Sequence, residues 1–163
     1  MTTQVETTAV LPNERFSRLA NDAQIQRVAR ALEARGIRAF IAANGEEARA
    51  KVLELLPEGA EVFLGSSTTL KELGLNEIID NANRLNSVRA RLAKMDRNTQ
   101  GREMVKMGAV PEYIIGSVQA VTEDGSVVIA SNTGSQLAPY AASAARVIWV
   151  VGAQKIVLTL EDG

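Results

Sequence analysis

The sequence predicts an α/β domain of three layers, with a mostly parallel central sheet and one antiparallel hairpin. Three observations lead to this class. Helical and strand patterns alternate as helix, strand, helix, strand over residues 22–64, which is typical of a parallel sheet. Residues 62–70 read as an apolar strand, a Gly/Ser/Thr turn and the start of a helix. In the second half, Asp124-Gly125 separates two β-rich segments and predicts a hairpin.

The first helix is expected to begin at Asn21 or Asp22 and to end before Gly36, a residue that commonly follows a helix. Apolar residues recur at helical spacing between these limits: Ile25, Val28, Ala29 and Leu32. Residues 37–42 are then expected to form a strand.

The second helix is expected to begin after Asn44, which can cap it, with Glu47 as the partner in a capping box. Pro57 stops this helix, and residues 61–64 form the next strand. The order of these elements is what favours parallel strands.

Residues 70–107 are expected to be mostly helical and are rich in cations. These cations are Arg84, Arg89, Arg91, Lys94, Arg97, Arg102 and Lys106. The simpler interpretation is a solvated helical face with the usual i,i+4 pairs. The alternative is that one or two of the cations lie over the strand ends and bind an anionic substrate.

After Pro111 the composition becomes typical of strands. Strands are expected at residues 113–117, 118–122, 126–130, 146–151 and 155–160. A short helix of small residues is expected at 136–145. With no repeat or linker, residues 13–163 read as a single domain, and the Thr-rich segment 1–12 is expected to be mobile.

Composition excludes several classes of function. The chain has 163 residues and a formal net charge of −1, so it lacks the basic footprint of a nucleic-acid or anionic-membrane binder. It has no Cys and no His, which excludes thiolate catalysis, iron–sulfur clusters and histidine acid/base chemistry within this chain. No cofactor and no metal site is predicted. Residues 1–10 have no apolar signal core, and the best apolar run, 147–151, is strand-sized, so we expect a cytoplasmic protein.

The turn Gly65-Ser66-Ser67-Thr68-Thr69 is the strongest candidate for a binding site. Backbone N–H groups, hydroxyls and the positive end of a helix dipole can converge there, and this combination suits a phosphate or a carboxylate. The alternative is purely structural, because Ser and Thr cap helices and glycine after a strand is ordinary in turns.

Three stretches together resemble the LUD domain, the lactate-utilisation family. They are GSVQAVTEDG at 116–125, VIWVVGAQKIV at 147–157, and the turn GSSTTL at 65–70 followed by Leu73-Gly74. The resemblance implies a Rossmann-like fold similar to glucosamine-phosphate deaminase, ribose-phosphate isomerase and coenzyme A transferases. Such folds often hold phosphorylated or acyl-type ligands at turns beyond strand ends.

The resemblance implies lactate or related organic-acid metabolism and a small anionic ligand, whether phosphorylated, carboxylate or CoA-type. Two alternatives stay open. One is a non-catalytic subunit that assembles with iron–sulfur or flavin oxidoreductase partners, or with itself as a homo-oligomer. The other is a stand-alone isomerase or transferase on the same fold. Whether the chain is an enzyme is left open.

Several residues beyond the first turn enter the expected site. Glu123 is the candidate general acid/base, with an exposed turn residue as the alternative. Gly134-Ser135-Gln136 would form a second side of the same cleft, Gly116 opens the family-like stretch, and Lys155 would supply a cation unless it is a snorkelling edge lysine.

The sequence also departs from the family pattern in two places. Some family members carry Asn-Arg where this chain has Ser135-Gln136, so a fixed cation is missing there. Many members continue with another helix beyond the position of Gly163. Two interpretations follow: a short member of the family, or a chain that lacks its C-terminal part.

Overall fold

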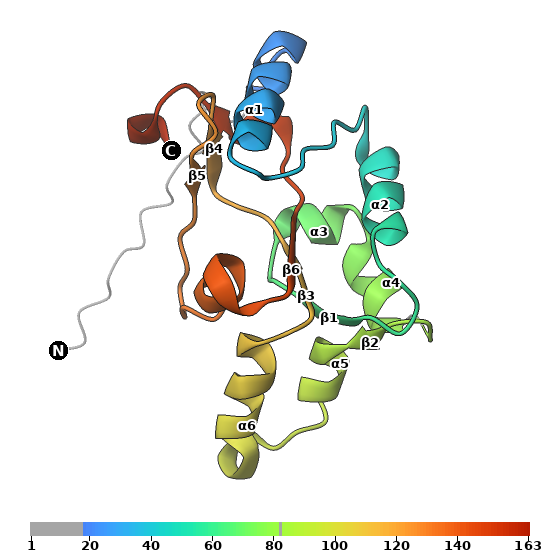
Figure 1. Cartoon of the computed structure of the whole chain (residues 1–163). Helices are drawn as coiled ribbons and strands as arrows, with labels where there is room; N and C mark the ends of the chain where they lie inside the picture. The colour runs from blue at the N-terminus through green and yellow to red at the C-terminus, as the bar shows by residue number, and fades with distance from the viewer. Residues whose placement is uncertain (1–17, 82) are drawn as a thin grey trace, which may run out of the picture.

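The main sheet of the protein has four parallel strands in the order β2-β1-β3-β6, in a computed structural model that describes residues 18–81 and 83–163 (Figure 1). These strands are β1 (Glu61–Leu64), β2 (Asn86–Ser87), β3 (Tyr113–Gly116) and β6 (Arg146–Trp149). All three pairings are parallel. The predicted α/β class is therefore confirmed. The expectation for segment 1–12 lies outside the described residues.

A second, smaller sheet continues from the main one. It contains β5 (Val127–Val128), β4 (Ala120–Thr122) and β7 (Ile156–Val157), in that order. The pair β4–β5 is the predicted antiparallel hairpin, and Gly125 at its turn has φ +84°, a conformation that favours glycine. The pair β4–β7 is parallel, as is β3–β6 before it. Two neighbouring parallel strands of the main sheet, β3 and β6, are thus followed along the chain by two neighbouring parallel strands of the small sheet, β4 and β7. The two sheets separate where β3 leads into β4.

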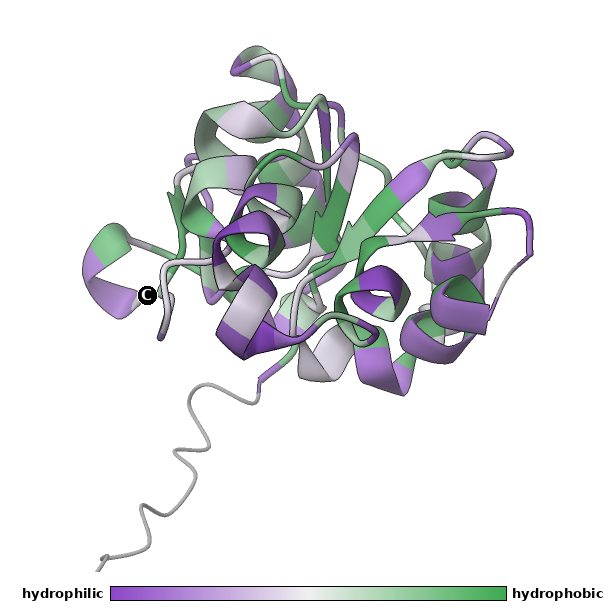
Figure 2. Cartoon of the chain, turned by 90° about the horizontal axis from the view of Figure 1, so that it is seen from below, coloured by the Kyte–Doolittle hydropathy of each residue, from purple (hydrophilic) through white to green (hydrophobic). Residues whose placement is uncertain are grey.

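Helices cover both faces of the main sheet. On one face, Val62 and Leu64 of β1 pack in a buried cluster with residues of α2 (Gly45–Glu54), α3 (Thr68–Glu72) and α4 (Leu75–Asn81). On the other, Phe63 contacts Gly108 of α6 (Arg97–Ala109), and α5 (Val88–Leu92) lies beside it. Figure 2 shows strands in which hydrophobic residues predominate and helices in which hydrophilic and hydrophobic residues are mixed. This alternation along β1 produces the expected three layers.

The first helix, α1 (Asp22–Ala34), covers the small sheet instead of the main one. Its Val28 packs with Val118 and Val121 in a second apolar cluster. The hairpin turn approaches this helix so closely that a Cβ on Gly125 would lie 2.9 Å from the backbone carbon of Ala31. The hairpin and α1 therefore form one packed unit at the end of the main sheet (Figure 1).

The predicted helix starts are confirmed, with one difference in detail. Asn21 caps α1 and Gly36 follows it with φ +81°. Asn44 caps α2 by accepting a hydrogen bond from the backbone N–H of Glu47. The Glu47 carboxylate, however, accepts from the N–H of Ala43 and not from that of Asn44, so the reciprocal half of the capping box is displaced by one residue.

The expected strand at residues 37–42 is wrong. The segment is an irregular connection from α1 to α2, and Phe40 and Ile41 are 54% and 44% exposed. Lys51 covers the Phe40 ring, with its Nζ 5.3 Å from the ring centroid. The physical reason is that the segment has to cross from the helix on the small sheet to a helix on the main sheet (Figure 1), so its apolar composition serves local contacts and not a sheet.

Some later elements are shorter than predicted. Residues 136–145 contain a π-helix, η2 (Pro139–Ser143), and β5 and β7 have two residues each. Beyond β7 the chain turns into a short 3₁₀ helix, η4 (Leu160–Asp162). Short strands are sufficient here because they extend only a three-stranded sheet.

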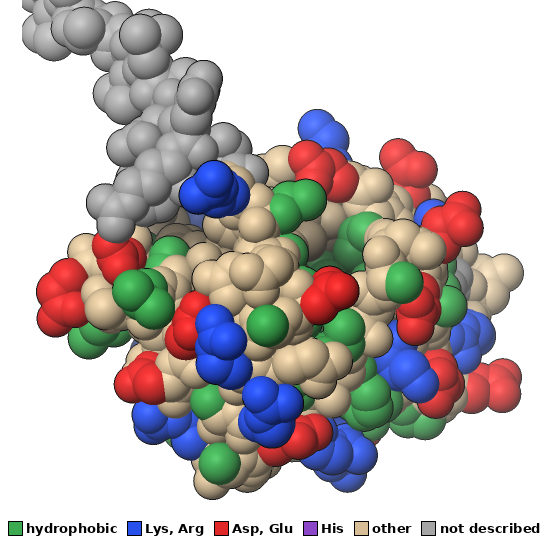
Figure 3. Space-filling model, turned by 90° about the horizontal axis from the view of Figure 1, so that it is seen from above, with side chains coloured by type: hydrophobic (Ala, Val, Ile, Leu, Met, Phe, Trp, Pro, Cys, Tyr) green, Lys and Arg blue, Asp and Glu red, His purple; other side chains and the backbone are tan. Residues whose placement is uncertain are grey.

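The cation-rich segment is mostly helical, as predicted, and four of its seven cations have partners: Arg84, Arg89, Arg91 and Lys106. Arg91 pairs with Glu61 at the amino end of β1, and Arg89 pairs with Asp80. Arg84 donates to the carbonyl oxygens of Leu53 and Leu56. Figure 3 shows charges of both signs interspersed over one face of the molecule. None of the seven cations lines the cleft described below, which favours the solvated-face interpretation, although none of the ion pairs given for them has the expected i,i+4 spacing.

Among the described residues, no helix combines the length and the apolar character that crossing a bilayer requires.

Candidate binding cleft

A polar cleft of about 350 Å³ opens at the carboxyl ends of β1 and β3, where the two sheets part. The segments that follow three neighbouring strands of the main sheet contribute to it. They are the turn after β1, the link from β3 to β4, and the link from β6 to β7. In open α/β sheets, ligands bind at this edge because loops from different strands converge there. The lining residues are Gly65, Ser66, Ser67, Thr68, Thr69, Glu72, Ser117, Val118, Gln119, Gln136, Tyr140, Gln154 and Lys155.

The predicted Gly/Ser/Thr turn forms one wall of this cleft. The Gly65 N–H donates to the Ile115 carbonyl at 2.8 Å and so extends the pairing of β1 with β3. The Ser67 hydroxyl caps α3, with 3.5 Å between its oxygen and the backbone nitrogen of Leu70. In the described part of the chain, the hydroxyls of Ser66 and Thr68 have no hydrogen-bond partner. In this turn, one hydroxyl caps a helix, and two hydroxyls form no hydrogen bond with the described residues.

The helix dipole contributes little at this turn. The helix α3 has only five residues, and its first turn is capped by Ser67 from within the chain. A macrodipole sums over aligned peptide units, so a helix this short has a weak one. A positive charge in this cleft therefore has to come from a side chain.

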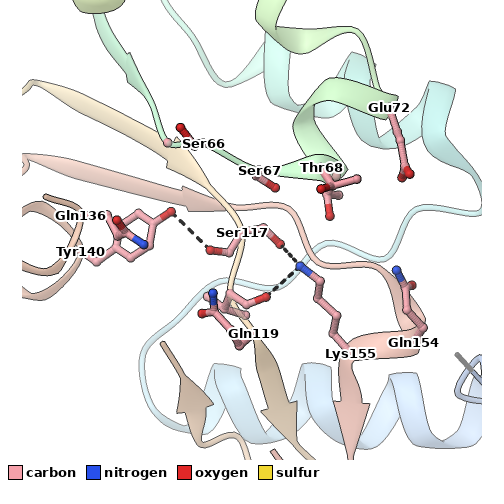
Figure 4. Close-up of a pocket in the computed structure, with 13 residues that line it drawn as sticks. Ser66, Ser67, Thr68, Glu72, Ser117, Gln119, Gln136, Tyr140, Gln154 and Lys155 are labelled. Atoms are coloured by element: carbon pink, nitrogen blue, oxygen red, sulfur yellow. Dashed lines mark hydrogen bonds between the residues drawn. The ribbon is translucent and has the colours of Figure 1, made fainter. Parts of the chain in front are cut away.

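Lys155 supplies that charge. Its Nζ donates to the Ser117 hydroxyl at 2.9 Å and to the Val118 carbonyl at 2.8 Å (Figure 4). Both acceptors are neutral, and within residues 18–81 and 83–163 no carboxylate forms an ion pair with this ammonium. Burial lowers the pKa of Lys155, an effect that the charge of Glu72 partly opposes. A lysine has three donors, so one remains for a ligand.

Tyr140 and Gln136 close the opposite end of the cleft from Glu72 and Gln154 (Figure 4). The Tyr140 hydroxyl donates to the Ser117 carbonyl at 3.4 Å, and burial raises the pKa of this phenol. Its ring meets Trp149 edge-on, with centroids 5.7 Å apart.

Gly116 lies beneath the cleft and is not part of its lining. A Cβ there would lie 1.5 Å from the Tyr140 hydroxyl oxygen, so only glycine leaves room for this ring. Gly116 therefore acts through packing: it fixes where Tyr140 stands at the cleft.

Glu123 lies on the hairpin, outside the cleft. Arg27 donates to its carboxylate from Nε at 2.8 Å, and the Gln24 amide donates at 2.9 Å, both from α1. These hydrogen bonds, that of Arg27 above all, lower the pKa of Glu123. A carboxylate with a lowered pKa and two protein donors fastens the hairpin to α1, which is a structural use of the side chain.

Comparison with known proteins places the chain in a family. The model of the LUD domain matches residues 25–163, which include both sheets and every residue that lines the cleft. The chain belongs to the LUD-domain family. No curated protein and no solved structure matches it.

In this LUD domain, the sequence prediction and the cleft overlap in part. Seven predicted site residues line the cleft: Gly65, Ser66, Ser67, Thr68, Thr69, Gln136 and Lys155. Gly116, Glu123, Gly134 and Ser135 do not line it. Among the described residues, no group of three acidic side chains is arranged to hold a metal ion.

The sequence prediction missed five polar residues of the cleft: Glu72, Ser117, Gln119, Tyr140 and Gln154. A usable signal existed for Ser117, because it is the last residue of the predicted strand 113–117 and the carboxyl ends of parallel strands meet at one edge. Glu72 follows Thr68 by four residues, so both occupy one face of α3. Tyr140 had no local signal, since only the close approach to Gly116 brings it to the cleft.

Proposed function

We propose that this LUD-domain protein binds a small anionic metabolite in the cleft, as part of lactate or related organic-acid metabolism. The observation that carries the proposal is the Lys155 ammonium, which donates to two neutral oxygens and forms no ion pair with the described residues. A half-buried ammonium without a direct ion-pair partner is unfavourable, and an anion in the cleft would supply that partner.

The surroundings of Lys155 support an anion of modest size. A cleft of about 350 Å³ lies at the lower end of the range of small-molecule sites. Ser66 and Thr68 present hydroxyls without partners, which can donate to carboxylate or phosphate oxygens. Tyr140 is the only aromatic residue in the lining, so the described cleft offers no pair of rings to sandwich a base.

Calorimetric titration with L-lactate, glycerol 3-phosphate and acetyl-CoA tests the proposal. We expect Lys155→Met to weaken binding by about tenfold or more, because a hydrogen bond to a charged group is lost. Lys94→Met is the matched control: Lys94 is exposed and outside the cleft, and its loss should leave affinity unchanged.

The pH dependence gives a second readout. Affinity for the anion should fall as the pH rises, because Lys155 then loses its charge. Since burial lowers the pKa of Lys155, this fall should occur below pH 10.5, the ordinary lysine value. Absence of binding by all three compounds, or equal affinity in the wild type and Lys155→Met, would overturn the proposal.

A further inference from the structure

We infer that Glu72 selects among anions: the cleft takes a singly charged ligand with a hydrogen-bond donor opposite its anionic group, in preference to phosphate monoesters. Small hydroxycarboxylates and aminocarboxylates share this chemistry. The inference rests on the proposed function, because Lys155 has to hold the anionic group.

The first argument is the charge of the lining. Among the described residues, Lys155 is its one cation and Glu72 its one carboxylate, so their formal charges sum to zero. A carboxylate ligand neutralises Lys155 and adds a single negative charge. A phosphate monoester brings nearly two at neutral pH, of which one faces Glu72 without compensation. Like charges at close quarters disfavour the dianion.

The second argument is that the two charges are held apart. Lys155 turns to Ser117 and Val118 and forms no ion pair with Glu72, although the two side chains line the same cleft. In Figure 4 the Lys155 ammonium lies in the middle of the cleft, and Glu72 lies at the end that also holds Gln154. Separated opposite charges across a cleft complement a ligand with an acceptor at one end and a donor at the other.

The third argument is the hydrogen-bond inventory of Glu72. An ionised carboxylate only accepts hydrogen bonds, and among the described residues nothing donates to this one. Its neighbours in the cleft, Thr68 and Gln154, are also without side-chain partners in the described part of the chain. All three side chains are exposed, so a ligand hydroxyl or ammonium would replace water at this carboxylate, with further polar groups beside it.

The test compares four probes by calorimetry at pH 8, where a phosphate monoester is a dianion because its second pKa is about 6. The probes are glycolate, the amino acid glycine, acetate, which lacks the donor, and glycerol 3-phosphate. In the wild type we expect glycolate and glycine to bind more tightly than acetate and glycerol 3-phosphate.

Glu72→Gln should change these affinities in opposite directions. We expect it to weaken glycolate and glycine by about fivefold, since a charge-assisted hydrogen bond becomes a neutral one. Acetate should be unchanged, and glycerol 3-phosphate should bind several-fold more tightly. Glu77→Gln, an exposed glutamate of α4 outside the cleft, is the matched control and should alter none of them. A purely structural role of Glu72 would move all four affinities together.

The outcomes separate this inference from the proposed function. If Lys155→Met abolishes binding but Glu72→Gln shifts every probe equally, the selection by Glu72 is wrong and anion binding stands. Tighter binding of glycerol 3-phosphate than of glycolate by the wild type also overturns the selection. If the wild type binds none of the four probes but binds L-lactate or acetyl-CoA, this inference fails and the proposed function stands. If L-lactate and acetyl-CoA also fail to bind, both fail.

Discussion

The Gly65–Thr69 turn and the turn at residues 131–136 have similar compositions, yet their hydrogen bonds differ. In the first, Ser67 caps α3, and Ser66 and Thr68 have no partners in the described part of the chain. In the second, the Ser131 hydroxyl accepts from the Gly134 N–H at 2.9 Å and donates to the Gln136 side chain at 2.9 Å.

The rest of the second turn is tied together in the same way. The hydroxyls of Thr133 and Ser135 are 3.0 Å apart, and Gly134 takes φ +75°, which shapes the turn. Of the three residues predicted there, only Gln136 reaches the cleft. The difference teaches that a Gly/Ser/Thr turn can offer hydroxyls to a ligand only where its own hydrogen bonds do not use them.

The largest expected effect comes from a substitution at Gly116, beneath the cleft. Gly116→Ala would place a Cβ 1.5 Å from the Tyr140 hydroxyl oxygen, so the ring has to leave its position. We expect the free energy of unfolding to fall by about 3 kcal/mol, as for severe overpacking. Urea denaturation measures it. Gly101→Ala in α6, where a Cβ meets nothing, is the control and should stabilise slightly. Equal stability of the two variants would contradict the packing role of Gly116.

A pair of serine substitutions sharpens the comparison of the turns themselves. Ser131→Ala removes two hydrogen bonds within the second turn and should lower the free energy of unfolding by about 1 kcal/mol, with ligand affinity nearly unchanged. Ser66→Ala should do the reverse: stability stays within about 0.5 kcal/mol, and affinity for the anion falls. Thermal unfolding and calorimetry on both variants provide the measurements. The same profile in both variants would show that the two turns do not differ in use.

The smallest effect concerns Glu123, which the fold uses for structure. Its pKa is lowered, so it contributes stability above the pKa of the unfolded chain, and this contribution is lost as the pH falls through the folded value. We expect Glu123→Gln to be less stable than the wild type at pH 7, and the difference to close as the pH falls below 4.5. Ligand affinity should not change. A large loss of affinity in this variant would return Glu123 to the binding site.

Much of the fold could be predicted because its signals are local. Asn21, Asn44 and Gly125 fix helix starts and a turn through their own hydrogen bonds or dihedral angles. Residues 37–42 failed because strand composition does not say whether a neighbouring strand is in reach. Their position between two helices on different sheets is a long-range property.

The site was harder to predict, and the reason is again distance along the chain. The Gly65–Thr69 turn and Lys155, which line the cleft, were predicted as site residues from their own stretches of sequence. The contact of Glu123 with Arg27 could not be predicted, because the two residues are 96 positions apart and nothing in the sequence around Glu123 indicates it. Tyr140 was missed because only the space above Gly116 brings it to the cleft.

The hydrogen bonds of Lys155 also connect two segments of the chain. Its ammonium spans the gap between the chain that leaves β3 and the chain that enters β7, through Ser117 and Val118. The same hydrogen bonds that hold the charge at the cleft also join the two chain segments that run from the main sheet to the small sheet. A ligand that competes for this ammonium changes these hydrogen bonds. Amide exchange in the short strand β7 should therefore report whether the cleft is occupied, although β7 does not line the cleft.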